Sequence, residues 1–169
     1  FDESAVILPG EHFVVVEDTP VFASVYGTAI RIGAKYDGSL DNGGEWLKLV
    51  DGSGELVDEV YFDDDAPWPT NADGTGPSLQ LVDRLEDNNR VGNWLAATNG
   101  SLFTPGAGNS VTSDLPAFPR LWLNELQPTN VTGLRDNFNE RDPWIELYNN
   151  GSSALNLTNC YRTDTYTNL

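Results

Sequence analysis

Short β-rich runs dominate this chain of 169 residues, and helical periodicity is nearly absent from it. The runs are rich in branched and aromatic residues, and clusters of Gly, Pro, Asn and Asp separate them. This alternation of short strands and turn signals is typical of a β-sandwich or a β-barrel. The sequence therefore predicts an all-β fold.

The clearest element is a hairpin at 45–62. Leu47 and Leu49 share one face of its first strand and Lys48 lies on the other. The turn residues at 51–54 lead into a second strand at 56–62. Further strands are expected at 12–17, 29–32, 79–81, 121–126 and 144–148. A short element is expected after Asn93, and a short helix or turn within 19–28. The run at 12–17 is apolar on both faces, which predicts a central strand.

The formal net charge is -17, from 26 acidic and 9 basic residues. Such a surface repels the phosphates of nucleic acids and anionic lipid headgroups, and it favours cations or basic partners. The simplest interpretation is that the charge keeps an exported domain soluble. No apolar run of spanning length is present, so neither nucleic-acid binding nor direct membrane insertion is expected.

The chain contains one cysteine, Cys160, so an intrachain disulfide is excluded. Its position between Leu157 and Tyr161 predicts a small buried side chain. The chain starts at Phe1 without a signal peptide, which we interpret as a fragment of a longer polypeptide. Few lysines and many Asn, Thr, Gly and Ser favour an extracellular, cell-surface or periplasmic location.

Several motifs resemble those of one family. The acidic, proline-rich stretch at 61–70 (YFDDDAPWPT) and the stretch at 73–79 (DGTGPSL) resemble the centre of the lamin tail domain. The turn at 40–45 (LDNGGE), the Asn93-Trp94 pair and the stretch at 104–106 (TPG) extend this resemblance. It implies an immunoglobulin-like β-sandwich.

The matching pieces stand in a permuted order. Residues 1–106 resemble the back of one lamin-tail copy, and 121–169 resemble the front of the next, through the runs at 123–126, 144–149 and 155–164. Cys160 stands where the family usually has tryptophan. Residues 107–120 have the composition of a linker. We expect 121–169 to fold back and complete the same sandwich, which gives a circular permutation; the alternative is completion of a neighbouring molecule by strand exchange.

The resemblance implies a non-catalytic interaction or adhesion module of a larger, repetitive secreted or cell-surface protein of bacterial type. Family members accompany catalytic domains and position them. A partner would then be a protein or a glycan. The alternative is a calcium- or carbohydrate-binding module, and an acid–base hydrolase is a third hypothesis.

A calcium site is the strongest metal hypothesis. Asp63, Asp64, Asp65 and Asp73 lie in one acidic loop, and Ca²⁺ takes six to eight oxygen ligands. Their spacing is not that of an EF-hand, and a solvated loop is the simpler interpretation. A second acidic loop at 136–142 gives a weaker pattern.

Two tryptophans and two glutamates are further candidate site residues. Trp46 and Trp122 are expected to point outward from their strands, where they would form an exposed aromatic ligand surface; burial on both faces or an interdomain contact is the alternative. Glu125 and Glu146 would supply a hydrolase with its acid and base, but strand-edge hydrogen bonds explain them more simply. His12 is the only histidine and no phosphate-binding glycine loop is present, so no catalytic residue is expected and the chain is predicted not to be an enzyme.

Overall fold

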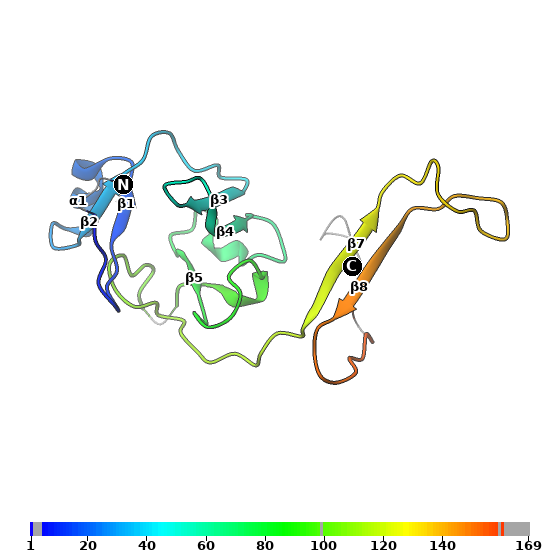
Figure 1. The fold of residues 1–169 in the computed structure, drawn as a ribbon. Coiled ribbons are helices and arrows are strands. Elements are labelled where there is room, and N and C mark those ends of the chain that lie inside the picture. The colour runs from blue at the N-terminus through cyan, green and yellow to red at the C-terminus, as the bar shows by residue number, and fades with distance from the viewer. Residues whose placement is uncertain (2–4, 99, 159, 161–169) are drawn as a thin grey trace. The chain divides into compact units, whose positions relative to one another are not determined.

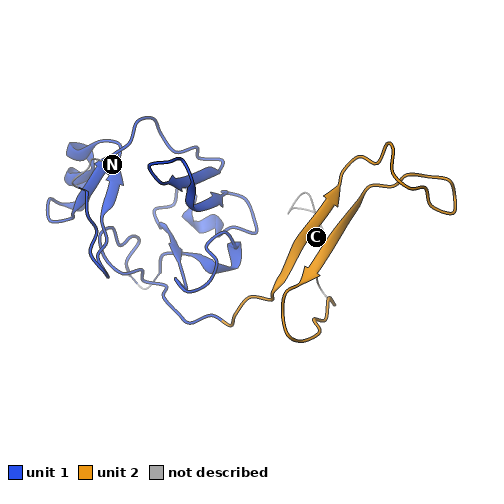
Figure 2. Ribbon diagram, viewed as in Figure 1, with its two compact units in different colours: residues 1–115, 165–169 blue, residues 116–164 orange. Residues whose placement is uncertain are grey.

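The computed structural model describes residues 1, 5–98, 100–158 and 160. The chain divides into two compact units, Phe1–Leu115 and Pro116–Asp164 (Figure 2). In the described residues the regular structure is mostly strand, with one α-helix and two short 3₁₀ helices (Figure 1). The strands form four two-stranded sheets, which agrees with an all-β class, and these described strands do not form the larger sheets of a closed sandwich.

The first sheet of unit 1 pairs β1 (Val14–Val16) with β2 (Ile32–Lys35) in parallel. A parallel pair needs a crossover, and α1 (Thr19–Tyr26) lies within it, inside the span where a helix or turn was expected. The carboxylate of Asp18 caps this helix by accepting a hydrogen bond from the backbone N–H of Val21 at 2.8 Å.

Two expectations for this first sheet are wrong. The strand expected at 29–32 lies at Ile32–Lys35 instead, because the residues that pair with β1 are Ile32, Ala34 and Lys35. The run at 12–17 was expected to be central, but among the described strands β1 pairs with β2 alone. Apolar residues on both faces therefore did not produce a strand flanked on both sides.

The second sheet is the hairpin of β3 (Glu45–Val50) and β4 (Leu56–Phe62), and the structure confirms both expected strands. Asp51 closes its turn, because one carboxylate oxygen accepts hydrogen bonds from the N–H groups of Ser53 and Glu55. The hydroxyl of Ser53 donates to the same oxygen. Together these hydrogen bonds hold the pKa of Asp51 below its ordinary value, and the bond from the Ser53 hydroxyl contributes most.

The third sheet pairs β5 (Leu79–Leu81) with β6 (Trp94–Ala96), and the 3₁₀ helices η1 (Thr70–Ala72) and η2 (Val91–Asn93) lie before β5 and β6 in the chain. The apolar core of unit 1 lies mainly around this sheet. Its buried apolar residues are Val16, Trp68, Val82, Ala96, Ala97 and Val111. Three buried polar side chains accompany them: Gln80, Asp83 and Asn93.

Part of the segment expected as a linker lies along β5. Gln80 accepts hydrogen bonds from the N–H and the hydroxyl of Ser110, at 2.8 and 2.9 Å, and Asn109 donates to the carbonyl of Leu81 at 2.9 Å. Val111 is buried among the core residues. Residues 109–115 therefore belong to the first unit, and their polar composition supplies the hydrogen bonds that hold them there.

The described part of unit 2 contains one antiparallel hairpin, β7 (Leu121–Gln127) and β8 (Trp144–Asn149) (Figure 1). The register shifts between Leu123 and Glu125, so that Asn124 forms a bulge. None of the described residues from 116 to 158 is buried.

The expected burial of Cys160 is wrong, since this residue is exposed and the described part of unit 2 has no core to cover it. Residues 161–169, which the sequence assigns to the completing strands, lie outside the described residues. No helix in the described ranges is long and apolar enough to cross a membrane.

Candidate functional site

A cavity of about 430 Å³ lies in unit 1 between the β3–β4 hairpin and β5–β6. Its apolar walls come from both sheets and from the loop between them. These wall residues are Leu47, Val60, Phe62, Trp68, Leu79 and Trp94. Four carboxylates also line it, from Asp41, Asp63, Asp64 and Asp73. The lining thus combines apolar walls with four carboxylates, here called the acidic rim.

The alternation of side chains between the two faces of a strand determines which residues form the cavity walls. Leu47 and Val60 are register partners, so they share the face of the hairpin that lines the cavity. On the other side Trp68 is buried and lies 6.1 Å from Trp94 between ring centroids. The indole N–H of Trp94 donates to the carbonyl of Asn88 at 2.7 Å, which fixes the orientation of this ring.

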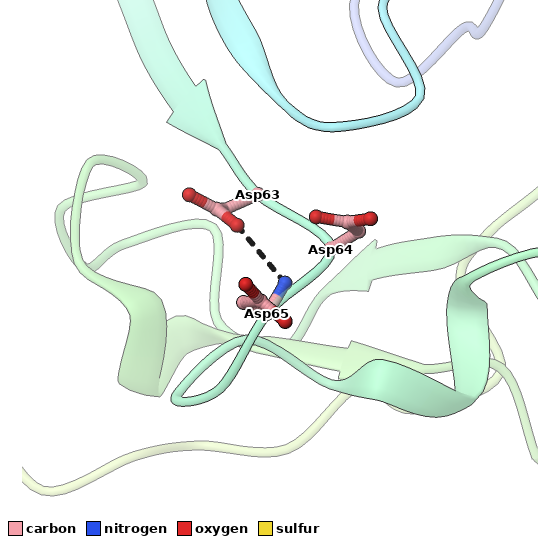
Figure 3. Close-up of side chains that lie close together, drawn as sticks. All are labelled: Asp63, Asp64 and Asp65. Carbon is pink, nitrogen blue, oxygen red and sulfur yellow. Dashed lines mark hydrogen bonds between the residues drawn. The ribbon is translucent and has the colours of Figure 1, made fainter. Parts of the chain in front are cut away.

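Three of the four expected calcium ligands come together at the end of β4. Carboxylate oxygens of Asp63, Asp64 and Asp65 lie within 4.8 Å of one another, and Asp63 accepts a hydrogen bond from the N–H of Asp65 at 2.9 Å (Figure 3). Such a cluster could hold a divalent metal ion. Asp73 is not part of it, although it lines the same cavity and accepts a hydrogen bond from the amide of Asn42 at 3.4 Å.

Tyr61 adjoins this acidic cluster. Burial raises the pKa of its phenol, and the negative charge of Asp63 adds to the effect. A tyrosine phenol is already neutral at pH 7, and the raised pKa keeps it so. It therefore offers the neighbouring carboxylates no compensating charge.

The outer face of the same hairpin carries Trp46, which is 49% exposed. Its ring lies 5.4 Å from the ring of Tyr61, and the ammonium of Lys48 lies 5.2 Å from the Trp46 ring centroid. Lys48 also forms an ion pair with Glu59 at 2.8 Å. Trp46 thus points away from the Leu47 face, as expected, but Tyr61 and Lys48 already engage its ring.

Trp122 is 45% exposed and pairs across the hairpin with Tyr148 in unit 2. The two tryptophans of the expected ligand surface therefore belong to different units. Each is half exposed beside a tyrosine.

Glu125 and Glu146 are register partners on β7 and β8, and both are exposed. The side-chain amide of Asn124 donates a hydrogen bond to Glu146. Neither glutamate lines the cavity of unit 1, nor a second cavity that the β7–β8 loop forms around Asn130 and Asp136. The arrangement matches strand pairing with a local hydrogen bond more closely than an acid and a base in a cleft.

A second acidic cluster forms in the loop between β7 and β8. Carboxylate oxygens of Asp136, Glu140 and Asp142 lie within 4.8 Å of one another, and all three residues are exposed. Asp136 accepts hydrogen bonds from the N–H groups of Phe138 and Glu140, which explains the tight loop without a metal. This exposed acidic cluster therefore provides a control for experiments on the cluster of Asp63, Asp64 and Asp65.

Sequence reasoning missed Asp41 as a lining residue, because its Asp-Asn-Gly-Gly stretch has the composition of an ordinary turn. Gly44 supplies the missing signal. A Cβ there would lie 2.4 Å from the carbonyl oxygen of Phe62, and the backbone φ of Gly44 is 101°. Only glycine lets this turn approach the end of β4 so closely, and that approach brings Asp41 to the cavity.

No family model, curated protein or solved structure matches this chain.

Proposed function

We propose that this chain is a non-catalytic interaction module of a larger, repetitive secreted or cell-surface protein, and that it binds by sheet completion. One observation carries the proposal: a face of the β7–β8 hairpin is made of aliphatic side chains that nothing in the described part of unit 2 covers. Its members are Leu121, Leu123, Leu126, Ile145 and Leu147, here called the aliphatic face.

The aliphatic face is strongly exposed. Leu123 is 72% exposed, Leu126 62% and Leu147 46%. An isolated two-stranded hairpin is at best marginally stable in water. Full burial of one leucine side chain contributes about 1.5–3 kcal/mol. A second sheet packed on this face would therefore supply the stability that the hairpin lacks.

The resemblance to the lamin tail domain supports a specific covering sheet. In an immunoglobulin-like sandwich the inner faces of two sheets are aliphatic and pack against each other. We infer that the aliphatic face is one such inner face, and that a lamin-tail-like module in a neighbouring chain supplies the other by strand exchange. The circularly permuted sandwich, in which 121–169 complete their own chain, is the competing arrangement.

Light scattering on the 169-residue chain, across a concentration series, tests the proposal. We expect the mean mass to rise with concentration. In Leu123→Lys a charge stands in the aliphatic face, so we expect the mass to fall to that of a monomer. Leu134→Lys is the matched control, because Leu134 is an exposed residue of the β7–β8 loop. This control should associate as the wild type does.

A wild-type chain that stays monomeric at every concentration would contradict assembly by strand exchange. Circular dichroism on each variant would separate lost association from lost folding. A monomer in which Leu123→Lys lowers the melting temperature would favour the circularly permuted sandwich.

A calcium-binding module is the second hypothesis, and the clustered carboxylates of Asp63, Asp64 and Asp65 favour it. A glycan-binding surface at Trp46 is the related alternative, supported by the half-exposed ring beside Tyr61. Quenching of tryptophan fluorescence by a glycan, lost in Trp46→Ala, would favour that alternative.

A further inference from the structure

We propose that the cavity of unit 1 binds an arginine side chain presented by an extended, apolar segment of a partner protein. This inference goes beyond the sheet completion proposed above, because it concerns another unit and does not require the chain to associate with itself. It rests on the match between the walls of the cavity and the charge at its rim.

The walls suit the aliphatic part of such a ligand. The cavity measures about 430 Å³ and is lined by Leu47, Val60 and Leu79 together with the rings of Trp68 and Trp94. Binding cavities commonly measure about 300–1,000 Å³ and have mainly apolar walls. The three-carbon stem of arginine covers apolar surface well while its charged end stays near water.

The rim suits the guanidinium. Asp63 and Asp64 are half-buried, and the exposed Asp41 and Asp73 line the same cavity. Among the residues that the structure describes, no lysine or arginine lines this cavity. Four carboxylates without a basic residue among them attract a cation, and partial burial strengthens the attraction relative to bulk water.

The combination favours arginine over other ligands. A metal ion would bind the carboxylates but would not contact the apolar walls. A neutral glycan would not neutralise the charge of the carboxylates. A guanidinium forms paired hydrogen bonds with carboxylates and stacks on aromatic rings. Here Trp94 and Trp68 line the same cavity as the four carboxylates. The net charge of -17 also steers basic partners toward the chain.

A pair of capped peptides tests this site on the 169-residue chain. The probe is acetyl-Val-Leu-Arg-Leu-Val-amide, and its control carries citrulline, a neutral analogue, in place of arginine. Isothermal titration calorimetry should show binding of the arginine peptide that weakens as salt is added. The citrulline peptide should bind at least about tenfold more weakly, because it lacks the charge that the rim recognises.

Substitutions in the chain test whether the arginine peptide binds in this cavity. In Asp63→Asn/Asp64→Asn we expect the affinity for the arginine peptide to fall about tenfold. The control Asp136→Asn/Asp142→Asn removes the same charge from the exposed loop of unit 2 and should leave the affinity unchanged. Ala72→Phe places a large side chain at the cavity wall and should also abolish binding. Circular dichroism would establish that each variant is folded.

The inference is wrong if the arginine peptide does not bind, if the citrulline peptide binds equally well, or if the two acidic pairs have equal effects. Each outcome can be told apart from a failure of sheet completion. A chain that is monomeric in light scattering and still binds the arginine peptide would support this site and contradict assembly by strand exchange.

Discussion

Asn93 and Asp83 are joined by a reciprocal pair of hydrogen bonds. The amide oxygen of Asn93 accepts from the backbone N–H of Asp83 at 2.8 Å, and its amide nitrogen donates to the backbone carbonyl of Asp83 at 2.8 Å. Asn93 is completely buried, and the same nitrogen also lies within hydrogen-bonding distance of the carbonyls of Glu86 and Asp87. One side chain therefore fixes the loop between β5 and β6, next to the core.

Asn93→Ala should destabilise unit 1 strongly. The substitution leaves the buried N–H of Asp83 without its partner, removes one of the two donors to the Asp83 carbonyl, which keeps the N–H of Glu86 at 3.3 Å, and opens a small cavity. We expect a loss of about 2–4 kcal/mol in the free energy of unfolding, measured by urea titration. The control Asn71→Ala removes an exposed side chain in η1 and should change that free energy by less than about 0.5 kcal/mol. Equal effects of the two variants would contradict the role assigned to Asn93.

Asp83 should make the stability of unit 1 sensitive to acid. Hydrogen bonds from the N–H groups of Leu115 and then Leu85 hold the pKa of the buried Asp83 below its ordinary value. Because the folded state favours the charged form, this stabilisation is present above the unfolded pKa of about 3.9 and is lost as the pH falls through the folded value. We expect Asp83→Asn to melt at a lower temperature than wild type at pH 7.

The gap between these two melting temperatures should narrow as the pH falls below about 4. Thermal melts at a series of pH values check this. Asp114→Asn changes an exposed carboxylate close by in sequence and serves as the control. A gap that stays constant down to the acid transition would show that Asp83 does not act through its charge.

Hydrogen exchange should distinguish residues 109–115 from a free linker. The N–H of Ser110 donates to Gln80, that of Ser113 to the carbonyl of Val82, and that of Leu115 to Asp83. We expect these three amides to exchange far more slowly than the amide of Ala117, which lies beyond the segment. Gln80→Ala should speed exchange at Ser110 first. Equal exchange at all four amides would mean that the segment is not held along β5.

Local sequence signals predicted the elements that local chemistry determines. The β3–β4 hairpin follows from strict alternation around Leu47 and from a turn that Asp51 closes, so its bounds were predicted correctly. The position of β2 depends on its pairing with Val14, far away in the chain, and the apolar run alone placed it too early. Register between distant strands is set by tertiary contacts, which periodicity does not contain.

The residues of the candidate site likewise include some that local sequence predicts and others that only tertiary contacts bring together. Asp63, Asp64 and Asp65 are adjacent in sequence, and their clustering was predictable. The position of Asp73 in the same loop predicts that it joins them, yet the structure places it outside the cluster, where it accepts a hydrogen bond from Asn42. Asp41 reaches the rim through the close approach of Gly44 to Phe62, a contact that composition does not reveal.

Calcium should stabilise unit 1 if the cluster of Asp63, Asp64 and Asp65 holds the ion. Binding to the folded state alone raises the free energy of unfolding by about 2.7 kcal/mol at a ligand concentration 100 times the Kd. We therefore expect a higher melting temperature in CaCl₂ than in EGTA at matched ionic strength, and no such shift in Asp63→Asn/Asp65→Asn. Asp136→Asn/Asp142→Asn should keep the shift. If calcium raises the melting temperature equally in both double variants, the first cluster is not the site, because general screening of the net charge would then explain the effect.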